Sequence, residues 1–69
     1  MLEPGTRVRI LGPLPFVHLR SPLGTVAGPA EGGGYVLVRL DHPATVTCGL
    51  EPEELTEIVW AIDNLEVVG

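Results

Sequence analysis

The chain contains no lysine, and its only basic residues besides two histidines are four arginines, set against nine acidic residues for a net charge of −5. A surface that binds nucleic acid neutralises phosphates with a cluster of cations, and this releases the counterions that the phosphates had held. A domain with an isoelectric point near 4.7 would have to gather its arginines on one face. The composition therefore disfavours nucleic acid as a partner. Because the guanidinium group suits phosphate and carboxylate, the candidates for a modest anion contact are Arg7, Arg9 and Arg39, with Arg20.

Cysteine is almost absent as well. The single Cys48 excludes a disulfide within the chain, and its free thiol fits a reducing compartment. Together with His18 and His42 it could supply three metal ligands, but the spacing matches no standard zinc pattern. We expect structural roles for these side chains, and no metal or cofactor.

Long hydrophobic runs are also lacking. No apolar stretch approaches the roughly 20 residues that span a bilayer. The start, Met1-Leu2-Glu3-Pro4, has neither the basic residues nor the apolar segment of a secretion signal. We therefore expect a soluble, cytoplasmic protein with no membrane partner.

The sequence contains no recognisable catalytic motif. Asp41 and His42 could form an acid/base pair, but the following Pro43 favours a turn. The acidic run Glu51, Glu53, Glu54 and Glu57 could receive a basic partner, or could be the solvated start of a helix. The prediction is a protein without enzymatic activity.

Alternating and β-branched residues predict one all-β domain over residues 1–69, a barrel of five strands. Arg7–Ile10 alternates charged and apolar side chains, and Gly12 and Pro13 follow it as breakers. Glu31–Gly34 is the loop of a hairpin, because glycine accepts positive φ. The other predicted strands are 23–30, with a bulge or edge at Gly28-Pro29, 35–40, 58–62 and 65–68, with a 3₁₀ turn over 63–65.

The connecting segments are less regular. Residues 12–22 contain three prolines and should run irregularly over the surface, with Phe16, Val17 and Leu19 tucked against the barrel. Asp41-His42-Pro43 should end its strand. Residues 44–49 could add a short strand, and residues 50–55 resemble a single helical turn.

These elements resemble the SH3-like barrel superfold over nearly the whole chain, with residues 44–57 as an insertion. Three pieces carry the likeness: Gly5-Thr6-Arg7-Val8-Arg9, Gly24-Thr25-Val26, and Asp63-Asn64-Leu65-Glu66-Val67-Val68. Similar pieces occur in KOW-type and other small bacterial barrels, so the resemblance implies a fold more than a function.

The chain also resembles the plasmid-borne type II dihydrofolate reductases, SH3-like barrels that assemble as tetramers around a central pore. Gly5-Thr6-Arg7-Val8-Arg9 matches their first strand, and Ile58-Val59-Trp60 takes the place of their pore-lining strand. The catalytic residues do not carry over. Ile10 and Leu11 stand where the family has a basic residue, and Ile58 and Trp60 replace the pore glutamine and tyrosine.

Two predicted strands are apolar on both faces, whereas a small antiparallel sheet ordinarily keeps one face polar. Tyr35, Leu37, Ile58 and Trp60 are predicted to face outward and to bury against a second copy or another protein. Alternatively, the segments 12–22 and 42–57 fold back and cover that face. The strand register decides which face Trp60 occupies.

The sequence thus favours a protein-interaction or self-assembly module, homo-oligomeric and non-enzymatic. With one small core and no disulfide, association is the leading source of extra stability. A KOW-like nucleic-acid or ribosome-associated module is the first alternative, and predicts clustered arginines and salt-sensitive RNA binding. A degenerate reductase-like oligomer is the second, and predicts a tetramer with Trp60 lining a central cavity.

Overall fold

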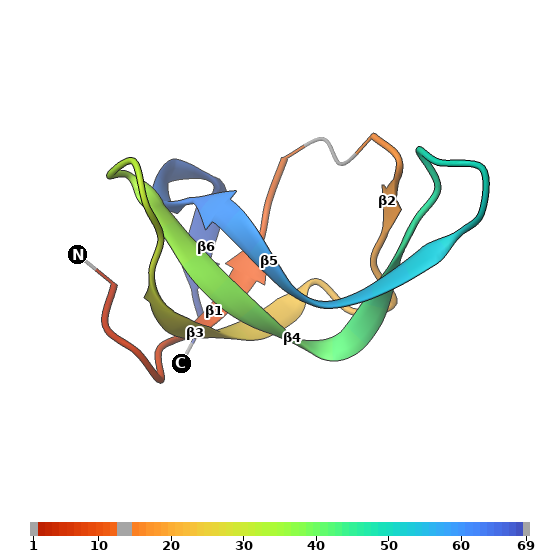
Figure 1. Ribbon diagram of the computed structural model, residues 1–69. Helices are drawn as coiled ribbons and strands as arrows, with labels where there is room; N and C mark the ends of the chain where they lie inside the picture. The colour runs from red at the N-terminus through yellow and green to blue at the C-terminus, as the bar shows by residue number, and fades with distance from the viewer. Residues whose placement is uncertain (1, 13–14, 69) are drawn as a thin grey trace.

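The computed structural model describes residues 2–12 and 15–68. Its antiparallel strands form one curled sheet, shaped like half a barrel (Figure 1). The elements in chain order are β1 (Arg7–Ile10), β2 (Val17–His18), β3 (Leu23–Pro29), β4 (Tyr35–Val46), β5 (Glu53–Ala61), the 3₁₀ helix η1 (Ile62–Asn64) and β6 (Leu65–Val67). The predicted all-β, barrel-like fold is confirmed.

The pairing places β4 at the centre of the sheet. The strands follow the order β6-β1-β3-β4-β5, and each neighbouring pair is antiparallel. The first half of β4 pairs with β3, and its second half pairs with the two-residue β2: Val17 lies opposite Val46 and His18 opposite Thr45. The sheet therefore has six strands, one more than predicted, because β2 forms inside the irregular segment 12–22.

Alternation along the strands builds the core. Val8 and Ile10 of β1 point inward, while Arg7 and Arg9 point to the other face. The same period along β4 buries Val36, Val38 and Leu40, and Ala44 is buried beyond the bend. The core consists of Val8, Ile10, Val26, Val36, Val38, Leu40, Ala44 and Ile58.

Gly24 of β3 pairs with Leu40 and packs tightly against β4. A Cβ atom built at this residue would stand 2.7 Å from the carbonyl oxygen of Arg39 and 2.7 Å from Cγ1 of Val38. Real carbon atoms do not approach so closely, so the packing of these two strands requires glycine here.

The turns follow the predicted chemistry. Gly32, Gly33 and Gly34 all have positive φ, between 65° and 96°, and join β3 to β4 as the predicted hairpin loop. The register of β3 against β4 shifts between Val26 and Gly28, which confirms the bulge. A 3₁₀ turn precedes the last strand, as predicted, although it begins one residue earlier, at Ile62.

Two predictions about residues 41–57 are wrong. Asp41-His42-Pro43 does not end its strand: β4 bends there, with a register shift between Arg39 and Ala44, and continues to Val46. The expected extra strand at 44–49 is this continuation. Residues 50–55 form no helical turn, because β5 already begins at Glu53 and pairs with Val46. Backbone pairing along the hairpin outweighs the local preference for a helical turn.

The segment before β3 holds a third difference. Val17 and Leu19 pack against the core as expected, but Phe16 is 63% exposed. Phe16 has a φ of 68°, a left-handed conformation that is rare outside glycine, and its carbonyl oxygen accepts a hydrogen bond from the Thr47 amide at 2.8 Å. Pro13 lies outside the described residues.

None of the described residues belongs to a helix long and apolar enough to cross a membrane.

Candidate interaction surface

The outward face of the β4–β5 hairpin carries a strip of apolar side chains. Tyr35 lies opposite Ala61, and Leu37 lies opposite Val59. These four residues alternate on both strands with neighbours that lie in the core or pack against it, so they share the face that points away from the core. We call Tyr35, Leu37, Val59 and Ala61 the outer strip.

Solvent reaches much of this strip. The exposed fraction is 47% for Tyr35 and 54% for Val59, while Leu37 and Ala61 are half-buried. Beside the strip lies an open hollow of about 280 Å³, lined by Tyr35, Val59, Trp60, Ala61 and Asn64. The strip is therefore an accessible apolar surface with an aromatic ring at one end.

The alternative that surface segments cover this face is not what the structure shows. Residues 42–57 do not fold back over the strip; they extend β4 and β5 into an arm that projects from the sheet (Figure 1). Leu50, at the tip of this arm, is fully exposed, and the neighbouring Glu51, Glu53 and Glu54 are exposed as well. Three of the four glutamates of the acidic run therefore lie within β5, and the run does not start a helix.

Two of the four residues predicted to face outward lie on the other face. Ile58 is 9% exposed and pairs with the buried Val38. Trp60 pairs with the buried Val36 and packs half-buried against the core. Its indole Nε1–H donates a hydrogen bond to the carbonyl oxygen of Leu11 at 3.3 Å, which links β5 to the end of β1.

The outward residue that the prediction missed is Val59. Residues 58–62 are apolar throughout, so alternation within that run cannot fix the phase of the strand. Glu57 holds the signal: a charged residue just before the run belongs on the solvent face, and a period of two then places Val59 and Ala61 beside it. That signal can be used only if Glu57 belongs to the strand, and the predicted strand began after it, at Ile58, whereas β5 begins at Glu53.

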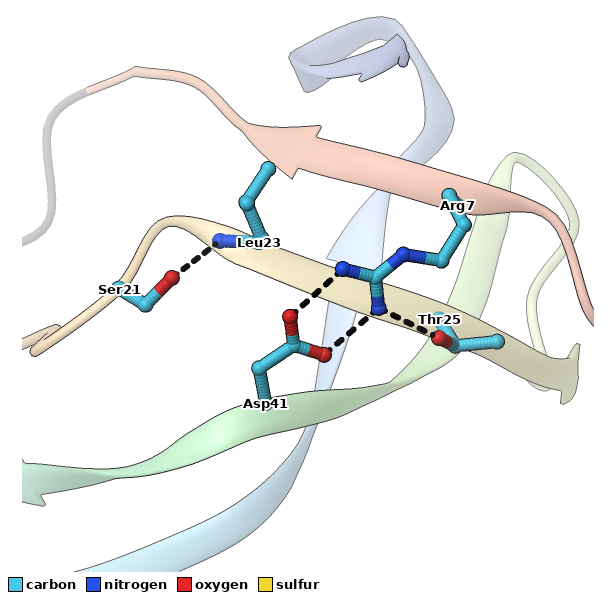
Figure 2. A network of polar contacts seen from close by, with 5 residues as sticks. All are labelled: Arg7, Ser21, Leu23, Thr25 and Asp41. Atoms are coloured by element: carbon cyan, nitrogen blue, oxygen red, sulfur yellow. Dashed lines mark hydrogen bonds and ion pairs between the residues drawn. The ribbon is translucent and has the colours of Figure 1, made fainter. Parts of the chain in front are cut away.

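Charged residues form a second band on the outward face. Arg7 of β1 reaches across β3 to Asp41 of β4, with Nη1–Oδ1 and Nη2–Oδ2 distances of 2.6 Å, and Nη1 also donates to the Thr25 hydroxyl at 2.9 Å (Figure 2). Arg9 pairs with Glu66 at 3.4 Å. The two-pronged geometry fixes Arg7 more firmly than a single contact would.

The third candidate for anion contact, Arg39, pairs with Glu57 at 3.5 Å across the β4–β5 ladder. Arg7, Arg9 and Arg39 thus each face a carboxylate of their own chain, whereas Arg20, the fourth candidate, is exposed and belongs to no ion pair among the described residues. These pairs are solvent-exposed, so each one alone adds little stability.

The pair of Arg7 and Asp41 shifts both titrations. The hydrogen bond from the Arg7 guanidinium lowers the pKa of the Asp41 carboxyl below its usual value of 3.8, and the positive charges of Arg7 and His42 act in the same direction. The hydrogen bond to Asp41 raises the pKa of Arg7. Both groups therefore stay ionised at neutral pH.

His18, His42 and Cys48 lie apart on β2, at the bend of β4 and on the arm, and all are exposed. Within residues 2–12 and 15–68, no three side chains of the metal-binding types come close enough to hold a metal ion.

No protein-family model, curated protein or solved structure matches this chain.

Proposed function

We propose that this chain is a non-enzymatic self-assembly module that associates through the outer strip. The observation that carries the proposal is the contiguity of Tyr35, Leu37 and Val59 on one exposed face. Contiguous apolar surface on a water-soluble domain marks an interaction site, and tyrosine is among the residues enriched at binding hot spots.

The size of the chain supports self-association. Its core consists of small and medium aliphatic side chains, and no disulfide supplements it. A domain of 69 residues buries only roughly 60% of the surface of its extended chain. Burial of the outer strip against a second copy would add apolar contact that the monomer lacks.

The charges favour this proposal over nucleic-acid binding. Arg7, Arg9 and Arg39 each face a carboxylate, so a phosphate would have to displace Asp41, Glu66 or Glu57. The negative charge of these carboxylates would also repel the phosphates, which opposes such binding.

For the fold we propose the SH3-like barrel type, supported by the order of the five longer strands and the 3₁₀ turn before β6. A reductase-like pore loses support from the placement of Trp60, whose indole is hydrogen-bonded within the monomer. A free, pore-lining Trp60 would need that contact to break. We place the protein in the cytoplasm, with a second copy of the chain as its partner.

The test compares two valines of similar exposure. Val59 in the outer strip is 54% exposed, and Val67 on β6 is 57% exposed. Lysine is introduced at each, because it does not add to the negative net charge. We expect V59K to lower the mass of the assembly at micromolar concentration and V67K to leave it unchanged, as measured by light scattering. A monomeric wild-type protein, or equal effects of both variants, would contradict the proposal.

A further inference from the structure

We infer that a second copy of this chain adds to the sheet along the free edge of β5, in antiparallel register centred on Val59. The inference rests on the proposed function and specifies how the two copies meet. It follows from the hydrogen-bonding phase of β5, from the distribution of charge along it and from the side chains that the register brings together.

The open edge of β5 is the starting observation. Within the described part of the chain, β5 pairs with β4 alone, although it is nine residues long. An unpaired edge presents a row of N–H and C=O groups to any incoming strand. Proteins protect such edges with charges, prolines or bulges. The stretch Ile58–Ala61 contains no charge and no proline.

The phase of the hydrogen bonds shows which groups face this edge. The amide of Ile62 donates to the carbonyl oxygen of Gly34 at 2.8 Å, so the backbone N–H of Ile62 points toward β4. Along an antiparallel ladder, hydrogen-bonded and non-hydrogen-bonded pairs alternate, so the backbone groups of Trp60 and Ile58 also point toward β4. The backbone groups of Glu57 and Val59, and the N–H of Ala61, then point to the free edge.

The other side of β4 confirms this phase. The amide of Ala30 donates to the carbonyl oxygen of Tyr35 at 3.2 Å, so the backbone groups of Tyr35 point toward β3 and away from β5. Its partner Ala61 must then turn its backbone groups away from β4. Pro29, which has no N–H, falls opposite Val36, where the ladder requires none.

Few registers satisfy the symmetry of a two-fold pair. Both strands contribute the same edge groups, so within the stretch Glu57–Ala61 a hydrogen-bonded pair joins residues from the set Glu57, Val59 and Ala61. A register centred on Val59 is the one that pairs these three residues among themselves. It places Val59 opposite the second copy's Val59, and Glu57 opposite its Ala61.

That register also suits the charges. It sets no carboxylate against another carboxylate, whereas a centre at Glu57 would oppose the two Glu57 side chains. Glu57 already faces Arg39 across the β4–β5 ladder at 3.5 Å. The valine pair at the centre is a favourable combination of β-branched side chains.

The outer strips merge in this arrangement. Leu37 lies opposite Val59 within one chain, so a row of Leu37, Val59 and the same two residues of the second copy crosses the symmetry axis. The stretch around Val59 thus pairs with a copy of itself without opposing charges and continues the apolar row, which favours a second copy over a strand from another protein.

Cysteine cross-linking tests the register, in chains where Cys48→Ser removes the exposed natural thiol. Hydrogen-bonded neighbours in an antiparallel pair have Cα atoms about 5.5 Å apart, a separation that a disulfide bridges. Val59→Cys should therefore form covalent dimers under mild oxidation. Leu37→Cys is the control: its two copies would lie three strand spacings apart, about 14 Å, beyond the reach of a disulfide.

Dimers from V59C and none from L37C are the expected result. Dimers from L37C, or from neither variant while the wild-type protein still assembles, would overturn the edge register and leave the proposed function standing, because the strips would then meet in another way. A wild-type protein that stays monomeric would overturn both.

Discussion

The Arg7 side chain joins three strands. From β1 it donates to the Thr25 hydroxyl on β3 and to both carboxylate oxygens of Asp41 on β4. Sequence alternation correctly places Arg7 on the outward face. Its partner could not be predicted, because Asp41 lies 34 residues away and depends on β4 continuing past the point where proline was expected to end it.

Removal of the Asp41 carboxylate should lower stability only where that group is ionised. Its pKa is lowered in the folded state, so its contribution is present above the unfolded value of 3.8 and is lost as the pH falls through the lower folded value. D41N should therefore melt below the wild-type protein at neutral pH and converge with it in acid. Thermal unfolding followed by circular dichroism across pH measures this.

The control is D63N, since Asp63 is exposed on η1 and is not in an ion pair with any described residue. A D41N deficit that persisted unchanged at acid pH would contradict the role given to the ion pair.

Gly24 offers a second test at a single residue. A methyl group there would clash with the Arg39 carbonyl and Val38, whereas at Gly28 it would meet no atom within 4 Å. G24A should destabilise the fold by about 1–3 kcal/mol, and G28A should change stability by less than about 1 kcal/mol. Urea unfolding at matched dilution compares them. Equal effects would mean that β3 and β4 are not packed as described.

At the scale of elements, the sequence predicts those strands whose patterns are local. Arg7–Ile10 shows alternation, and the hairpin of β3 and β4 is marked by its glycines. The length of β4 and β5 could not be predicted, because Asp41-His42-Pro43 reads as a stop. The bulge there absorbs the irregularity, while pairing with β5 keeps the strand going.

The phase of β5 decides the candidate surface and has its own test. Ile58 is buried against Val38, while Val59 is 54% exposed. I58A should destabilise the monomer by about 2–4 kcal/mol, because it leaves a cavity in the core. V59A should cost less than about 1 kcal/mol. Urea unfolding at dilution that favours the monomer separates the two, and the reverse ranking would place Val59 in the core.

For the whole molecule, the outer strip and the open β5 edge lie on the same hairpin. The apolar character of both strand faces could be predicted from the sequence and led to an interaction surface that includes Tyr35 and Leu37. The sequence could not predict that Val59, and not Ile58 or Trp60, lies on that surface, because a shift of one residue exchanges the two faces of the strand. The proposed self-assembly uses the corrected set, since Ile58 and Trp60 pack within the monomer.

The most direct test of self-assembly is sedimentation equilibrium of the unaltered chain across the micromolar range, with V59K beside it. We predict a mass that rises with concentration above the 7.3 kDa of the monomer, and a V59K protein that stays near the monomer mass. A wild-type mass of 7.3 kDa throughout would contradict the account.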